Sequence, residues 1–256
     1  MLETLAGWPL ITSPGFYAVA VPAVLLMGLG KSGFLSGFGA LATPLLALAV
    51  PVPQAAAIML PLLLVMDAAG LQQLWPERDR ALLRRLMPAG LLGIVVGTLL
   101  FGVLPAKTVA GIVGALTLLF VAQRLAFPPR ADRAPPPAWA AFGLATASGF
   151  TSFVAHAGSP PLNVYLLPLR LPPVTYAATT AVFFAAVNLA KWVPYAWLGL
   201  IDRSNLATSL LLVPLAPLGV WLGVFLARRI RSQWFYRVAY AGMFLTGAKL
   251  LFDGLR

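Results

Sequence analysis

The chain has 256 residues, of which 60% are hydrophobic and only 10% are charged, and its formal net charge is +11. Soluble domains carry about 25% charged residues, so this composition excludes a soluble domain and indicates an integral membrane protein. In so apolar a chain, basic loops that set the membrane topology explain the positive charge, and we expect no nucleic-acid partner. The absence of cysteine excludes disulfides, thiolate metal sites and thiol redox chemistry.

Hydropathy divides the chain into apolar segments, five in each half. A helix needs about 20 apolar residues to cross a hydrocarbon core of about 30 Å, and the first two segments of each half are short by this measure. We interpret these two as a re-entrant hairpin; two full spans would return the chain to the same face and give the same topology. The predicted segments are residues 14–30, 34–50, 54–75, 86–104 and 107–127, then residues 138–155, 160–171, 174–199, 206–227 and 233–253.

Repeated motifs indicate that the two halves are related. The tripeptide Ser-Gly-Phe begins at Ser32 and again at Ser148, and a proline follows each copy at the same distance, Pro44 and Pro160. We predict an all-α polytopic membrane protein with two inverted structural repeats, each a broken or re-entrant helical hairpin followed by three transmembrane helices. The repeats are residues 1–127 and 138–256, and the Pro-rich linker 128–137 between them cannot be helical.

Two Gly-x-x-x-Gly pairs, each preceded by a proline, also recur at matching places in the halves. They are Gly93 with Gly97 and Gly219 with Gly223. Their ordinary role is close packing of helices, and we expect them to pack one half against the other.

Basic residues in the loops predict that the repeats are inverted. The loop between the third and fourth segments is rich in arginine in the first half but holds only Arg203 in the second, and the next loop has the opposite bias. The positive-inside rule places the arginine-rich loops and the linker in the cytoplasm, and both termini outside it, for a protein of the cell inner (plasma) membrane. The arginines of these loops are Arg78, Arg80, Arg84 and Arg85, then Arg228, Arg229 and Arg231.

Helix breaks near residues 30–39 and 155–161 predict an anion site. Irregular backbone at membrane depth is tolerated only against protein or a watery cavity, and helix N-termini there offer amides and partial positive charge to an anion. Gly158 lies in the second break, and serine hydroxyls beside both breaks add donors, although each serine can instead bond its own helix. These serines are Ser32, Ser36, Ser152 and Ser159.

Charged groups at membrane depth sharpen this prediction, because each costs about 2.5–3.5 kcal/mol at a helix centre and persists mainly where it is paired or used. Lys191 is the strongest candidate ligand, since Thr180, Phe184, Asn188 and Tyr195 share its helix face. Asn188 and Lys191 together can hold an anion. The alternative for Lys191 is snorkelling toward water.

Three further groups have two interpretations each. Lys31 is either a substrate ligand or a charge on the cavity wall. Asp67, which corresponds within a residue to Asn188 in the other half, either forms an ion pair with Lys31 or Lys191 or carries a coupled proton. His156 is either a second proton carrier or a structural hydrogen-bonding residue.

Four stretches of the chain resemble the TauE/SafE sulfite exporter family, also called the four-toluene-sulfonate uptake permeases. The resemblance implies transport of small sulfur-containing anions or organosulfonates. Where this family often has a run of glycines before the proline, the chain has residues 39–43 and 158–159, which leaves the substrate open. The stretches are residues 28–39 leading to Pro44, residues 148–161, residues 165–170 and residues 179–191.

From these observations we predict a secondary transporter of sulfite or an organosulfonate, working by alternating access, with proton coupling that rests on His156 and Asp67 alone. An anion channel with the same lining residues is the alternative. The chain lacks a phosphate-binding loop for ATP, and one histidine with no cysteine makes an enzyme or a metal site hard to build. We therefore expect no catalytic residue, metal or cofactor, and a small anion and the bilayer as partners.

Overall fold

The computed structural model describes residues 10–31, 39–126, 136–227 and 232–256, and every regular element in these ranges is helical. The first half contains α1 (Pro14–Lys31), α2 (Gly39–Leu46), α3 (Val52–Leu74), the short 3-10 helix η2 (Trp75–Glu77), α4 (Arg80–Val103) and α5 (Ala106–Ala126). The second half contains α6 (Ala138–Ala155), α7 (Ser159–Leu166), the 3-10 helix η3 (Leu167–Leu169), α8 (Pro173–Ala190), α9 (Trp192–Trp197), α10 (Arg203–Leu212), α11 (Leu215–Ala227) and α12 (Ser232–Leu255).

Local sequence explains where several helices begin. The side chain of Asp79 accepts a hydrogen bond from the backbone of Leu82 at the start of α4, and Asp202 does the same for Asn205 at the start of α10. Both are N-caps, which satisfy amides that the first helical turn leaves unpaired. Prolines at residues 51 and 172 precede α3 and α8, where a fixed backbone angle suits the approach to a helix.

One of the predicted single segments is bent at a proline. Segment 206–227 is divided into α10 and α11, which are bent by 46° beside Pro214. Proline removes an amide donor and clashes with the carbonyl four residues earlier, so the prediction of an uninterrupted helix was wrong here. Segment 174–199 remains one candidate span: α8 and α9 meet at Lys191, and the hydrogen bonds from Lys191 to Val187 and from Tyr195 to Lys191 keep the helical spacing.

Five of the described helical segments are long and apolar enough to cross a membrane, or six if the bent α10–α11 pair forms one span. They include α1 and α6, of 18 residues each, whereas α2 and α7 have only eight residues. The expectation of segments too short to span is therefore confirmed for α2 and α7 but not for α1 and α6. Large apolar side chains on the outer surface, such as Leu99 at 62% and Val103 at 77% exposure, suit contact with lipid.

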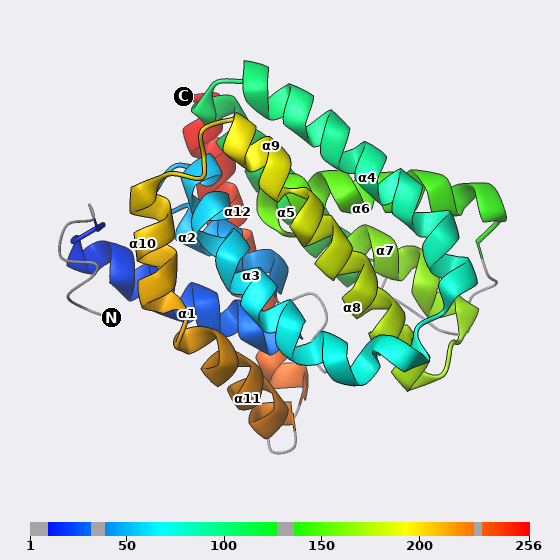
Figure 1. The fold of residues 1–256 in the computed structure, drawn as a ribbon. Coiled ribbons are helices and arrows are strands. Elements are labelled where there is room, and N and C mark those ends of the chain that lie inside the picture. The colour runs from blue at the N-terminus through cyan, green and yellow to red at the C-terminus, as the bar shows by residue number, and fades with distance from the viewer. Residues whose placement is uncertain (1–9, 32–38, 127–135, 228–231) are drawn as a thin grey trace.

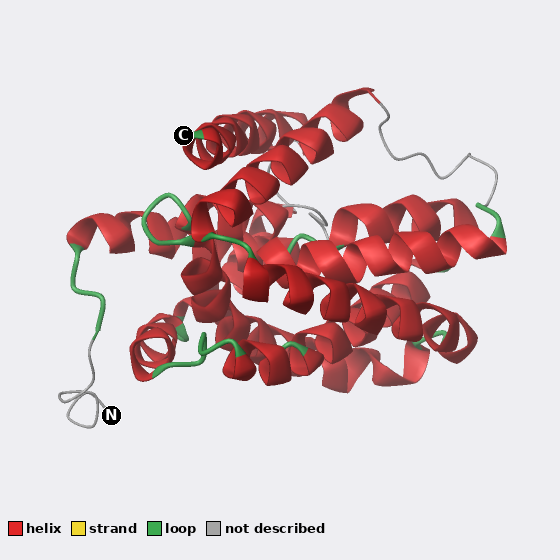
Figure 2. Cartoon of the chain, turned by 90° about the horizontal axis from the view of Figure 1, so that it is seen from above, coloured by secondary structure: helices red, strands yellow, loops and turns green. Residues whose placement is uncertain are grey.

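The two halves exchange their first helices. Helix α1 packs against α11 of the second half, and α6 packs against α4 of the first half. The other extensive contacts between the halves join α5 to α12 and α3 to α8; Figure 1 shows α3 and α8 side by side in the middle of the bundle, and Figure 2 shows α12 at the edge of the molecule. The first helix of each half thus packs mainly against helices of the other half.

Glycines allow the exchanged helices to approach at backbone distance. A Cβ atom added at Gly93 of α4 would lie 2.1 Å from the carbonyl oxygen of Thr146 in α6, and one added at Gly28 of α1 would lie 2.6 Å from the backbone of Gly219 in α11. The interpretation of Gly93 and Gly219 as packing residues between the halves is confirmed. The α5–α12 pair uses the same device at Gly114, which sequence reasoning did not single out.

Candidate functional site

The break between α6 and α7 places His156 at the end of α6. His156 adopts the left-handed conformation, with φ of 53°, and its amide donates to the carbonyl of Ser152 while the amide of Ala157 donates to Thr151. Pro160 and the proline that follows it in α7 have no amide hydrogen. The prediction that this break offers a row of unpaired amides was therefore wrong for most of it: only the amides of Gly158 and Ser159 remain, because ordinary C-capping uses the others.

The ring of His156 joins α6 to α3 and α8. Its Nε2 lies 2.9 Å from the carbonyl oxygen of Ala56, and its Nδ1 lies 2.8 Å from Nζ of Lys191. A carbonyl oxygen only accepts, so Nε2 carries the hydrogen and the neutral ring accepts from Lys191 at Nδ1. These two hydrogen bonds fit the structural role, which was one of the two interpretations of His156, and the proton-carrier interpretation stays a prediction.

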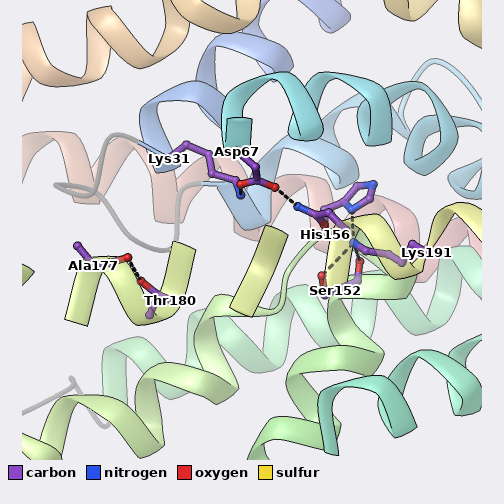
Figure 3. A network of polar contacts seen from close by, with 8 residues as sticks. Lys31, Asp67, Ser152, His156, Ala177, Thr180 and Lys191 are labelled. Carbon is purple, nitrogen blue, oxygen red and sulfur yellow. Dashed lines mark hydrogen bonds and ion pairs between the residues drawn. The ribbon is translucent and has the colours of Figure 1, made fainter. Parts of the chain in front are cut away.

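Lys191 is fully buried at the junction of α8 and α9, so the snorkelling alternative is wrong. Its Nζ donates to the carbonyl oxygen of Ser152 at 2.9 Å, to the Ser152 hydroxyl at 3.0 Å and to His156. These acceptors match the three donors of an ammonium group. Figure 3 shows Lys191 reaching Ser152 and His156.

Tyr195 of α9 contacts the same part of α6. Its hydroxyl donates to the carbonyl oxygen of Phe153 at 2.6 Å, and its ring packs edge-on against that of Phe153. The residues of the helix face that was predicted to hold the anion therefore have two different environments. Lys191 and Tyr195 bind α6, whereas Thr180, Phe184 and Asn188 line a cavity, described below.

A second polar cluster links α1, α3 and α8. Lys31, at the end of α1, forms an ion pair with Asp67 of α3, and Asn188 donates from Nδ2 to the other carboxylate oxygen of Asp67 at 2.7 Å. Of the alternatives for Asp67, the partner in this structure is Lys31 and not Lys191. The Lys31 ammonium also lies 5.9 Å from the centre of the Phe184 ring, within range of a cation–π contact.

A cavity of about 340 Å³ lies between the two clusters and is bounded by helices of both halves. Gly158 stands behind its wall, where an added Cβ would lie 2.7 Å from the Phe184 ring. Lys191 lies behind Ser152 and His156, and Ser32 and Ser36 lie outside the described residues. The predicted site residues that line the cavity are Lys31, Asp67, Ser152, His156, Ser159 and Asn188.

The cavity and its wall hold two lysines but one carboxylate. Among the described residues, Lys31 lines the cavity and forms an ion pair with Asp67, whereas Lys191 lies behind the wall and contacts Ser152 and His156. Lys191 therefore has no carboxylate partner among the described residues, and an anion in the cavity would balance its charge when it is protonated. The described residues contain no cluster of three metal-binding side chains of the His, Cys, Asp or Glu type.

Sequence reasoning missed two residues of the cavity wall, Asn163 of α7 and Tyr176 of α8. The hydroxyl of Tyr176 donates to Oδ1 of Asn163 at 2.6 Å, and Nδ2 of Asn163 is buried with no hydrogen-bond partner among the described residues. A signal was present, because Asn163 is an amide side chain within the apolar segment directly after the second helix break.

No curated protein and no solved structure gives a significant match to the chain. The family model that does match describes the sulfite exporter TauE/SafE, and the match covers residues 19–250, nearly the whole chain. The chain therefore belongs to the TauE/SafE sulfite exporter family.

Proposed function

We propose that the protein is a secondary transporter of a small sulfur-containing anion, sulfite or an organosulfonate, which binds in the cavity at Lys31 and Asn188. The observation that carries this proposal is a cavity, enclosed by both halves, that has two lysines at or behind its wall and a single carboxylate. Family membership supports the substrate class. The site residues that contact the anion are Lys31, Asn188, Ser159 and the Ser152–His156 wall; Lys191 acts from behind this wall, through its charge.

Exchanged packing of the halves supports alternating access. The contacts of α1 with α11 and of α6 with α4 have the reciprocity expected when two inverted repeats enclose one site. We infer that residues 1–127 and 138–256 are these repeats, and that one rocks on the other. An anion held between them is then exposed to each side in turn.

The cavity extends to Leu74, at the end of α3, and to Tyr176, in the first turn of α8. The loop that follows α3 holds the arginines assigned to the cytoplasm, so we infer that this structure faces inward, with the protein in the plasma membrane and both termini outside the cytoplasm. Lys191, Tyr195 and Phe153, which pack together behind Ser152 and His156, are fully buried, and we infer that they close the cavity at this end. A closed floor favours a transporter over the alternative of an anion channel.

Competition for Lys31 gives a route to proton coupling. A bound anion and Asp67 attract the same ammonium, so binding weakens the Lys31–Asp67 pair and leaves the carboxylate without its counter-ion. Asp67 is therefore our first candidate for the coupled proton. His156 is the second, because it lines the cavity beside Lys191.

The test uses the purified protein with sulfite, sulfate and small sulfonates, measured by thermal shift and by uptake into proteoliposomes. A ligand of the native state must raise its apparent stability. We expect stabilisation by a sulfur anion that Lys31→Gln abolishes and that Lys249→Gln retains, since Lys249 is an exposed lysine that pairs with Asp253 one helical turn away. Stabilisation that survives Lys31→Gln would refute this site, and steep single-channel currents would establish the channel instead.

A further inference from the structure

The helices form two bundles that do not coincide with the two halves of the chain. Bundle A comprises α1, α2 and α3 of the first half with α10 and α11 of the second, and bundle B comprises α6 to α9 of the second half with α4 of the first. Each bundle has a hydrophobic core of its own. Figure 1 shows α1, α10 and α11 on one side of the molecule and α4, α6 and α8 on the other, with α3 between them. The fourth segment of each half has therefore exchanged partners.

Backbone contacts tie the exchanged helices to their bundles. Helix α4 meets α6 at Gly93, and α1 meets α11 at Gly28 and Gly219, where an added Cβ would lie between 2.1 and 3.0 Å from the neighbouring backbone. Such contacts leave no space for one helix to tilt against the other, because small residues bring the backbones together and protein interiors are densely packed. Movement of one complete half against the other would have to pull both helix pairs apart.

Helix α3 lies at the interface of the bundles and is fixed to bundle A. Gln54 of α3 donates to Oδ1 of Asn205 in α10 at 3.1 Å, and the hydroxyl of Ser209 in α10 donates to the carbonyl oxygen of Ile58 at 2.8 Å. The face of α3 toward bundle A also carries the larger buried side chains, so α3 belongs with α10. Its buried residues are Ala55, Ile58, Met59, Leu62, Leu63 and Met66 toward bundle A, and Val52, Ala56, Ala57 and Leu60 toward bundle B.

Bundles A and B meet at the anion site. The cavity is lined by α1, α2 and α3 of bundle A and by the α6–α7 break, α7 and α8 of bundle B. Between described residues, two side-chain hydrogen bonds cross from one bundle to the other. Asn188 donates to Asp67, and Nε2 of His156 donates to the carbonyl oxygen of Ala56. A rotation of one bundle on the other would therefore change the cavity and leave both cores intact.

The chain passes directly between the bundles at two short connections, which occupy equivalent places in the two halves. They are residues 75–79, between α3 and α4, and residues 198–202, between α9 and α10. Gly199 in the second connection has a φ of +71°, and an added Cβ there would meet nothing within 4 Å, so this connection is loosely surrounded. Hinges of domain motion are a few residues at such element ends.

We propose that the two bodies that rock are bundles A and B, hinged at residues 75–79 and 198–202. Helix α4 then moves with the second half, and α10 and α11 move with the first. The α5–α12 pair, which packs against α2 of bundle A and contributes to the core of bundle B, lies outside both bodies. This inference rests on the proposed function, because it specifies which helices move together during alternating access.

Pairs of spin labels distinguish bundles from halves, because each label needs a cysteine and the chain has none of its own. Ala18 and Leu218 lie in one bundle but in different halves, as do Val103 and Phe142. Ala18 and Val103 lie in one half but in different bundles. The substitutions, all at exposed positions, are Ala18→Cys in α1, Val103→Cys in α4, Phe142→Cys in α6 and Leu218→Cys in α11.

The distances are measured by electron paramagnetic resonance on the purified full chain, with and without saturating sulfite or ethanesulfonate. We expect the anion to add a second distance for the Ala18–Val103 pair. The two pairs within a bundle are the matched controls, and each should keep a single, unchanged distance. Anion uptake into proteoliposomes by the same cysteine variants shows that the labels report on a working transporter.

A changed distance in either pair within a bundle would overturn the inference, since that bundle would not be rigid. If the Ala18–Val103 distance stayed constant at the same time, the halves themselves would be the moving bodies, and the proposed function would stand. Three constant distances in a protein that takes up the anion would overturn rocking of either kind. Absence of uptake of any sulfur anion would overturn the proposed function itself.

Discussion

Asn188 of α8 donates a hydrogen bond from Nδ2 to Oδ2 of Asp67 in α3 over 2.7 Å. The pair therefore joins the two halves of the chain beside the cavity. Asp67 also holds Lys31 from the end of α1. Removing the charge of Asp67 would therefore affect both the anion site, through Lys31, and the contact between the halves, through Asn188.

Replacing Asp67 with asparagine tests the competition for Lys31. The variant keeps an oxygen that accepts from Asn188 but removes the negative charge that opposes a bound anion. We expect binding of the transported anion to become on the order of tenfold tighter, about 1.4 kcal/mol, and the dependence of uptake on a pH gradient to disappear. Thermal shift and proteoliposome uptake measure the two effects.

Asp253→Asn is the control for Asp67→Asn, because Asp253 is an exposed carboxylate that also pairs with a lysine, Lys249. It should alter neither anion binding nor the response to pH. An Asp67→Asn protein that binds the anion no better than the parent would show that Lys31 and Asp67 do not compete with the substrate.

Lys191→Met tests the role of the buried ammonium. Methionine fills a similar volume but leaves Nδ1 of His156 without its donor, whereas the Ser152 carbonyl still accepts from the amide of His156. A buried acceptor left unpaired costs about 1–3 kcal/mol, so we expect the ligand-free protein to lose about 1–3 kcal/mol of stability. Thermal unfolding in detergent measures this, with Lys249→Met as the exposed control. Unchanged stability would mean that these contacts do not hold α8 to α6.

Much of the fold could be predicted from sequence because it depends on the lengths of the apolar segments and on the positions of proline and glycine. Helix α6 has the predicted limits, and Gly93 packs as expected, since both follow from local rules. The bend beside Pro214 was missed because apolar residues continue across it. Hydropathy depends on composition alone and does not detect the backbone hydrogen bond that a proline removes.

The candidate site was predicted less completely, because the hydrogen-bond partners of a side chain depend on how the helices pack in three dimensions. Helical spacing placed Asn188 and Lys191 on one face, but it did not show that Lys191 turns inward to Ser152 while Asn188 faces Asp67. Asn163 was missed for a related reason. A single asparagine in an apolar segment gains meaning only when Tyr176 and an unpaired amide are seen on a cavity wall.

Gly93→Ala tests the close contact of α4 with α6. The new Cβ would lie 2.1 Å from the carbonyl oxygen of Thr146, so the helices must separate. Overpacking of this kind costs about 1–3 kcal/mol, and we expect a matching fall in thermal stability. Gly143→Ala is the control, because an added Cβ there meets nothing within 4 Å and alanine favours a helix by about 1 kcal/mol over glycine. Equal effects of the two substitutions would contradict the packing argument.

The predicted sidedness can be tested with single cysteines, because the chain has none of its own and gives no background labelling. Lys107, at the start of α5, and Glu77, at the end of η2, are both exposed and lie at connections between helices that are assigned to opposite faces. A membrane-impermeant maleimide added to intact cells should label Lys107→Cys but not Glu77→Cys, and permeabilised cells should give labelling of both. The reverse pattern would invert the topology, and the cavity, which extends to Leu74 beside Glu77, would then face outward.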